Sequence, residues 1–206
     1  MNIRIDDYPT GVKPILSNKF NQFRKVLQLF EDADIYYHLG VVPKLIDKED
    51  IKFLNSLTHC IVCMHGVHHN FYTWSKLNED REEFRGKSVD EIVELLKEGQ
   101  EILKDTMMSP LYIPTFNQIN QNLVEALIRC NFRSITTGVN PPNVDYKDLL
   151  VYTPKDIFYG TSSYIYDNIN DFKMDDHIGL HLTWEVEESK SDWKLPAIIN
   201  HIQEVL

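Results

Sequence analysis

The regular alternation of strand-like and helix-like segments constrains the fold of this 206-residue chain more than any other feature. Short runs rich in Val, Ile, Leu and Tyr are followed by polar turns and then by stretches with apolar residues at helical spacing. Such alternation is typical of parallel βαβ units, which form either a barrel or an open sheet. Because several strand-like runs are short and residues 137–171 are irregular, we expect a distorted barrel with loop insertions.

Hydrophobic periodicity predicts where the individual elements lie. The clearest helix is residues 88–105, where Ser88 and Glu91 form a capping box ahead of apolar residues at helical spacing. Further helices are predicted at residues 19–30, 48–57, 120–130 and 195–205. Strands are predicted at residues 2–5, 34–42, 59–64, 111–113, 132–136, 149–152 and 177–184.

Length and composition indicate one globular domain over residues 1–206, long enough to bury a sizeable core. No apolar run approaches the roughly 20 residues that cross a bilayer, so no membrane span is expected. No basic stretch followed by an apolar one indicates a secretory signal. Three cysteines, an odd number, argue against a disulfide framework and favour a reducing compartment. We therefore expect a cytoplasmic protein.

The net charge of −10 argues against a nucleic-acid partner, because such affinity comes mostly from clustered Lys and Arg. The densest acidic runs, NEDREE and EVEES, are expected to be solvated. Cys60 and Cys63 form a CxxC pair, but a zinc finger needs about a dozen residues between its cysteines and its histidines. Because positions three apart on a strand face opposite sides, we expect structural thiols here.

Two adjacent carboxylates, Asp6 and Asp7, follow the first predicted strand and precede Tyr8 and Pro9. Neighbouring strand residues point to opposite faces, so both side chains can reach one site only where the strand ends. Pro9 supplies that ending, because it pushes Tyr8 into an extended or turn conformation. Two close carboxylates repel each other, and a divalent cation bound by one of them removes the conflict. An ordinary Asp-rich turn is the alternative.

The second group of candidate functional residues follows the third predicted strand and consists of His65 and His69. Their i, i+4 spacing puts both imidazoles on one face if a helical turn starts there, which suits a single metal ion. Gly66 stands where the HExxH protease signature has Glu, so a general base must come from elsewhere. A His-rich polar turn is the alternative.

One carboxylate with two imidazoles makes a three-ligand site with an open position, suited to zinc or another first-row divalent ion. Such a site lowers the pKa of a bound water and polarises a carbonyl oxygen. The second carboxylate can take the proton, and a protonated imidazole can give one to a leaving amine. His181, in GLHLTW, is the best remaining imidazole, with a core histidine as the alternative reading.

These segments, in this order, resemble the NodB-like polysaccharide deacetylases, in particular short members without secretion signals. The resemblance rests on RIDD, HGVHH, YIPTFN and GLHLTW and covers most of the chain. It implies a distorted (β/α)7 barrel that removes acetyl groups from N-acetylated sugars with a divalent metal, usually zinc. It further implies Asp6 as general base, His181 as general acid, an oxyanion contact from the Thr115 backbone amide, and as metal ligands Asp7, His65 and His69.

The sequence departs from the family pattern in two motifs. The third motif usually has an Arg two residues before the proline, which orients the base aspartate, and this chain has Tyr112 there. Thr115 replaces the usual Tyr after the proline. The family's Asp-x-x-Asp-Trp motif, which tethers the acid histidine, is echoed only by DYKDL, at Asp145, Asp148 and Leu149.

The leading hypothesis is a metal-dependent hydrolase that removes the N-acetyl group of an amino sugar or a glycan intermediate. One alternative is a carbohydrate-binding member of the same fold without turnover. Candidate aromatics for sugar stacking, each of which also suits a core, are Tyr72, Trp74, Tyr112, Phe116 and Trp184. Another alternative is an iron-dependent oxygenase, because two histidines and one carboxylate also serve such enzymes. The helical segments argue against it, since those enzymes usually have all-β folds.

Overall fold

The computed structural model describes residues 2–9, 17–69, 83–153, 157–160, 162–167, 177–181 and 194–205. Within them, eight strands form one sheet in which every described pair is parallel, in the order β6-β5-β4-β3-β2-β1-β8-β7. The strands are β1 (Asn2–Tyr8), β2 (Tyr37–Val41), β3 (Cys60–His65), β4 (Met108–Ile113), β5 (Ser134–Thr136), β6 (Leu150–Tyr152), β7 (Ile157–Gly160) and β8 (His177–His181). This is the circular order of a barrel, interrupted only between β6 and β7.

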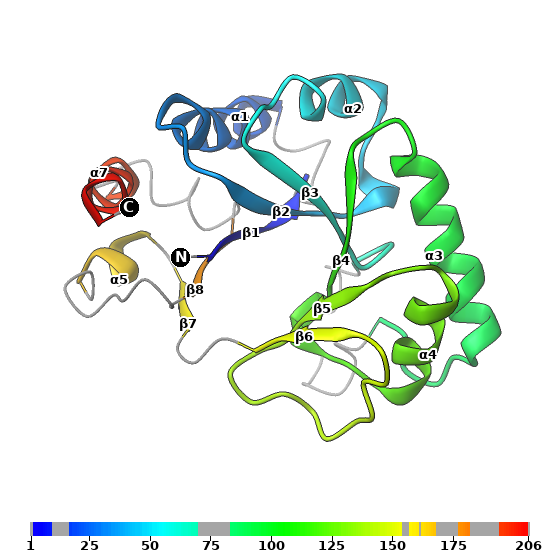
Figure 1. Cartoon of the computed structure of the whole chain (residues 1–206). Helices are drawn as coiled ribbons and strands as arrows, with labels where there is room; N and C mark the ends of the chain where they lie inside the picture. Colours follow the sequence, from blue (N-terminus) through cyan, green and yellow to red (C-terminus); the bar gives the residue numbers. More distant parts are fainter. Residues whose placement is uncertain are drawn as a thin grey trace.

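The sheet curls into an incompletely closed barrel (Figure 1). Its edge strands, β6 and β7, are consecutive in the chain and are separated by residues 153–156. A link of that length spans at most about 18 Å, so the two edges stay near each other although the described residues do not pair across the seam. The expected distorted barrel is confirmed, and the open-sheet alternative is not.

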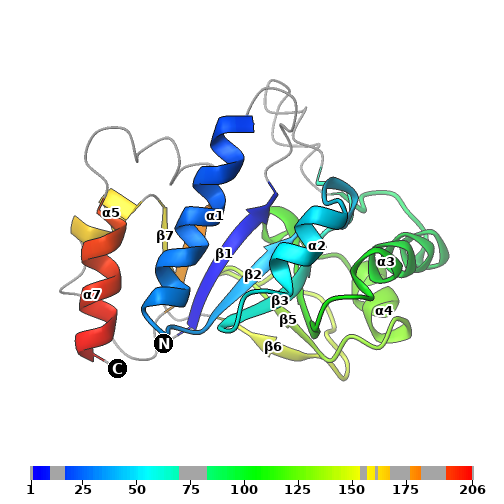
Figure 2. The same cartoon turned by 90° about the horizontal axis from the view of Figure 1, so that it is seen from above.

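Helices surround the outside of the barrel (Figures 1 and 2). In Figure 1, α1 (Ser17–Asp32) and α2 (Lys48–Leu54) lie above the sheet, and α3 (Val89–Leu103) and α4 (Gln121–Arg129) lie to its right. On the left, α7 (Leu195–Val205) contacts both α5 (Ser162–Asp167) and α1. Two short 3-10 helices, η1 (Pro43–Leu45) and η4 (Thr115–Asn117), follow the carboxyl ends of β2 and β4. Within the described ranges, no helix is long and apolar enough to cross a membrane.

Successive side chains on a strand point to opposite faces of the sheet, and the apolar ones form two separate clusters. Ile5, Leu39 and Met64 belong to the main core, which also contains the buried faces of the helices. On the other face of the sheet, Cys63 forms a small cluster with neighbouring apolar residues of β4, Leu111 and Ile113. Cys60 instead packs against the main core, and the three cysteines are free thiols, so the CxxC pair is structural, as expected.

Most predicted elements are present, with boundaries that differ by one to several residues. β1 runs through both aspartates to Tyr8 instead of ending at residue 5. The capping box of Ser88 and Glu91 starts α3, and α7 covers the whole predicted range of residues 195–205. The sequence does not predict β7 and α5, which lie in the irregular stretch 137–171. Residues 182–184, the end of the last predicted strand, lie outside the described residues.

Candidate metal centre

A β-bulge in β1 explains how two adjacent aspartates serve one site. Ile5 pairs with Leu39 and Tyr8 with Val41, so three residue steps on β1 face two steps on β2. Asp7, inside this bulge, has a φ of 71°, in the left-handed region that Asp tolerates better than most residues. Both carboxylates are buried, with Asp6 0% and Asp7 5% exposed. The extra residue turns Asp7 toward the site that Asp6 also lines.

Asp7, His65 and His69 converge on one point. Asp7 Oδ1 lies 3.1 Å from Nε2 of His65 and 3.1 Å from Nε2 of His69. One ligand atom of each residue lies within 4.8 Å of the others, and all three residues are buried. One carboxylate oxygen and two imidazole nitrogens form a donor set that suits zinc or another first-row divalent cation with open positions. These residues therefore fit the cation that the resemblance implies.

The orientation of His65 follows from the sheet. Its Nδ1 lies 3.0 Å from the carbonyl oxygen of Ile113, its register partner on β4, and donates to it. In the neutral ring the lone pair is then on Nε2, the nitrogen that faces Asp7, and in the protonated ring Nε2 donates to the Asp7 carboxylate. Burial lowers the pKa of His65, but the hydrogen bond to Asp7 and the charges of Asp6 and Asp7 outweigh burial and raise that pKa above its ordinary value.

The loop between the two histidines is not the helical turn that their spacing invites. Residues 66–69 adopt neither helix nor strand, and Gly66 and His69 have φ values of 61° and 42°. Two left-handed residues therefore bring His69 back toward the end of β3. The ring of His69 packs on that of Phe116, with 4.9 Å between centroids. His68 is exposed and is not a member of the cluster.

Asp6 lies beside this cluster and is held by an arginine. Nη2 of Arg4 is 2.8 Å from Oδ2 of Asp6, and both side chains are buried. The same guanidinium donates to Oγ1 of Thr136 at 3.1 Å and to Oδ1 of Asn117 at 3.2 Å. Arg4 therefore joins β1 to β5 and to η4. The sequence gives no sign of this role. Arg4 alternates with the buried Ile3 and Ile5, and this pattern is typical of a side chain that faces solvent.

Two further residues of the predicted site lie at strand ends near these groups. Thr115 is buried at the start of η4, and its Cγ2 lies close to the α-carbon of Gly66. His181 is the last residue of β8 and is the register partner of Asp6 on β1. Its backbone is therefore level with Asp6, whereas its side chain lies outside the described residues.

Tyr112 and Asp145, two further residues of the sequence motifs, do not join the site. Tyr112 is fully buried in the main core, with its ring edge-on to Phe132, so it offers no surface for a sugar. Asp145 accepts a hydrogen bond from the Lys147 backbone N–H in an exposed turn, and its own backbone pairs with Gln121 of α4. The candidate aromatics that lie outside the described residues are Tyr72, Trp74 and Trp184.

No family model matches this chain, and no curated protein sequence matches it. Solved structures do match. A family 4 carbohydrate esterase from Streptomyces lividans in complex with acetate has a TM-score of 0.64 at 10% identity, over 99% of this chain and 88% of that one. A polysaccharide deacetylase from Bacillus cereus has a TM-score of 0.58 at 16% identity, over 98% and 86%. A family 4 acetyl xylan esterase from Clostridium thermocellum in complex with a cobalt ion has a TM-score of 0.57 at 13% identity, over 98% and 81%.

These matches confirm the resemblance in fold. The chain has the distorted barrel of the NodB-like polysaccharide deacetylases, as the four sequence motifs predict. One fold can host several chemistries, so function depends on the residues of the site itself.

Proposed function

We propose that this chain, which has the fold of polysaccharide deacetylases, is a metal-dependent hydrolase that removes the N-acetyl group from an amino sugar or a glycan intermediate. The observation that carries the proposal is the cluster of Asp7, His65 and His69 beside the buried Arg4–Asp6 pair. It lies at the carboxyl ends of β1 and β3, where parallel α/β folds build active sites. An acetylated carbohydrate as substrate is supported by the matched polysaccharide deacetylase and acetyl xylan esterase.

Asp7, His65 and His69 would hold zinc or another first-row divalent ion. When bound, such a cation lowers the pKa of a water molecule and polarises a carbonyl oxygen. Asp6 takes a proton from the attacking water, whose oxygen forms the new bond to the acetyl carbon. The guanidinium of Arg4, 2.8 Å away, favours the ionised form of Asp6 and fixes its direction.

The carbonyl oxygen gains negative charge as this bond forms, and the backbone N–H of Thr115 donates to it. The carbon–nitrogen bond then breaks, and a protonated His181 gives its proton to the leaving amine. Acetate and the free amino sugar are the products. The register of β8 beside β1, with His181 opposite Asp6, supports this pairing of acid and base.

Arg4 also accounts for the unusual third motif. Tyr112 stands where the resembled family usually has the arginine that orients the base aspartate. Here Arg4 reaches Asp6 from within β1, two residues away. The absence of an arginine at position 112 therefore does not argue against turnover. A cytoplasmic location belongs to the same proposal and is supported by the free thiols of Cys60, Cys63 and Cys130.

Acetate release from a panel of sugars tests the proposal. The panel contains N-acetylated monosaccharides, nucleotide-linked sugars and polymers, with O-acetylated xylan for comparison, and each assay is run with zinc and after chelation. We expect zinc-dependent release from an N-acetylated member. Acetate release from xylan alone would show that the reaction is ester hydrolysis and not amide hydrolysis. Saccharide binding without acetate release would favour the carbohydrate-binding alternative. Oxygen uptake with Fe(II) and an oxo-acid would favour the iron enzyme.

A further inference from the structure

One carboxylate holds the loop that joins the two candidate metal-binding histidines. Oε1 of Glu83 accepts hydrogen bonds from the backbone N–H of Val67 at 2.9 Å and of His68 at 2.8 Å. Both amides lie between His65 and His69 in the chain. Hydrogen bonds to a charged acceptor are roughly twice as strong as neutral ones. Glu83 therefore restrains a segment that has no helix or strand of its own.

Glu83 is also packed closely against the bend in this loop. A Cβ on Gly66 would lie 2.1 Å from Oε2 of Glu83 and 2.5 Å from Cγ2 of Thr115. Glycine is needed there twice, for its φ of 61° and for the space that the carboxylate occupies. On the other side of the loop, the carbonyl of Val67 accepts from the backbone N–H of Lys44 at 3.1 Å. The bend is thus held at both backbone groups of Val67.

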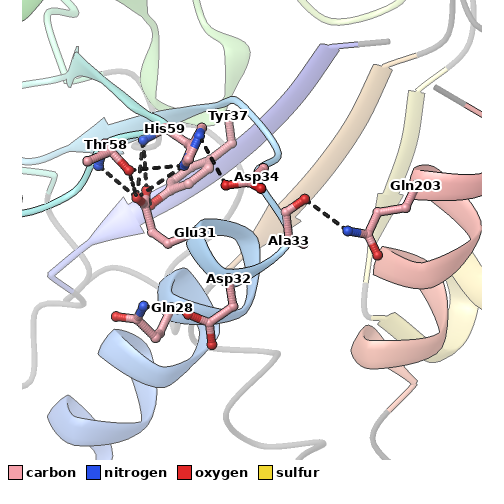
Figure 3. Close-up of polar contacts among 9 residues, drawn as sticks. All are labelled: Gln28, Glu31, Asp32, Ala33, Asp34, Tyr37, Thr58, His59 and Gln203. Atoms are coloured by element: carbon pink, nitrogen blue, oxygen red, sulfur yellow. Dashed lines mark hydrogen bonds and ion pairs between the residues drawn. The ribbon is translucent and has the colours of Figure 1, made fainter.

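The opposite end of β3 is held by the same kind of contact. Glu31 accepts from the backbone N–H of Thr58 at 2.7 Å and of His59 at 3.1 Å (Figure 3). The hydroxyls of Thr58 and Tyr37 donate to the same carboxylate. β3 therefore lies between two carboxylates that each bind two consecutive amides. Glu31, at the end of the strand away from the histidine cluster, is an internal control for Glu83.

We propose that Glu83 is a positioning residue that sets the cation affinity of the candidate metal centre by fixing His69. His65 has restraints of its own, the pairing of β3 and the Ile113 carbonyl. His69 lies beyond β3 with a φ of 42°, and the two amides that Glu83 binds belong to the residues directly before it. Loss of Glu83 loosens the backbone directly before His69 and leaves His65 and Asp7 in place. The inference rests on the part of the proposed function that concerns the metal centre. It does not depend on the proposed reaction.

Cobalt binding to the metal-free full chain tests this role without an activity assay. The d–d absorption of Co²⁺ and competition with a chromophoric chelator give the affinity of each variant. Glu83→Ala is expected to weaken cobalt binding by about 10-fold, the lower end of the range for groups that support metal ligands, because Glu83 binds the amides before His69 and not its ring. Glu83→Gln, which keeps one neutral acceptor oxygen, recovers part of that loss. Glu31→Ala removes the matching contact at the other end of β3 and leaves the cobalt affinity unchanged.

A double-mutant cycle separates an effect through His69 from general destabilisation. In a His69→Ala background, Glu83→Ala is expected to weaken cobalt binding no further. Additive losses, or an equal loss in Glu31→Ala, would overturn the inference. Circular dichroism checks that each variant is folded during the titration, and if Glu83→Ala is unfolded, Glu83→Gln against Glu31→Gln decides in the same way.

Failure of the proposed function has a different signature. If cobalt binding depends on Glu83 through His69 but no acetylated sugar releases acetate, the reaction is wrong and the role of Glu83 stands. Wild-type protein that binds no cobalt overturns both.

Discussion

The guanidinium of Arg4 contacts the carboxylate of Asp6 at 2.8 Å, within a single strand. Residues two apart on a strand share a face, so both side chains lie on the inner face of the curled sheet. Arg4 also binds Asn117 of η4 and Thr136 of β5. The aspartate that we propose as the base is therefore oriented from its own strand, through a network that includes the turn carrying Thr115.

Arg4→Gln removes the charge beside Asp6 and keeps a polar side chain. We expect kcat for acetate release to fall by about 100-fold or more, within the range that a positioned acid–base group contributes. Zinc should still bind stoichiometrically, because the ligand atoms of Asp7, His65 and His69 are unchanged. Added guanidinium should restore part of the activity. Arg129→Gln, which removes a surface arginine paired with Asp90, is the control. Full activity in Arg4→Gln would contradict this role.

Gly40 separates Asp6 from His65 across β2. A Cβ on Gly40 would lie 3.1 Å from Oδ1 of Asp6 and 3.2 Å from Cβ of His65. Gly40→Ala is expected to lower the free energy of unfolding by about 1–3 kcal/mol through overpacking and to reduce acetate release. Gly138→Ala is the control, because its nearest neighbour would be Asn117 Cβ at an ordinary 3.7 Å. Equal stability and activity of the two variants would show that the site tolerates the extra methyl group.

Metal analysis of single variants tests the ligand set. Asp7→Ala, His65→Ala and His69→Ala each remove one of three converging ligand atoms, so each should reduce the zinc content of the purified protein. His68→Ala removes an exposed imidazole from the same loop and should leave the zinc content unchanged. A stoichiometric divalent ion that persists after both Asp7→Ala and His65→Ala would show that the ligands are elsewhere.

Acid stability depends in part on Glu31. Burial raises the pKa of Glu31, but hydrogen bonds from Thr58, His59 and Tyr37 outweigh burial and hold that pKa below its ordinary value of 4.5. A carboxylate of this kind stabilises the fold above its unfolded pKa and loses that contribution as the pH falls through its folded pKa. The Tm of wild type should therefore fall more between about pH 6 and pH 3 than that of Glu31→Gln. Parallel curves in thermal denaturation would contradict this account.

The candidate functional residues were predictable because they stand at strand ends, and a parallel sheet brings these ends together. The bulge at Asp7 was not, since a positive φ at a residue other than glycine leaves no periodic pattern. Arg4 alternates with Ile3 and Ile5 like a solvent-facing residue, but the second face of a curled sheet is its interior. Only the curl of the sheet brings Thr136 of β5 and Asn117 of η4 to Arg4.

The acidic run NEDREE shows a second reason why some residues near the site could not be predicted from the sequence. The run reads as a solvated segment, and Glu83, within it, binds two amides of the histidine loop. Nothing local distinguishes Glu83 from its acidic neighbours, because its partners lie about 15 residues away in the chain and are chosen by the tertiary fold. The strand β7 and helix α5 escape prediction because both are short, with 4 and 6 residues, and short elements carry little periodicity.

The most direct test of the central claim measures zinc content and acetate release on the same samples of wild-type and Asp6→Asn protein. The substrate is an N-acetylated sugar that the wild type deacetylates. We predict equal zinc content in the two proteins and acetate release at least about 100-fold slower in Asp6→Asn, because the proton acceptor is lost while the ligands remain. Release by Asp6→Asn at the wild-type rate, or wild-type release that persists without zinc, would contradict the account.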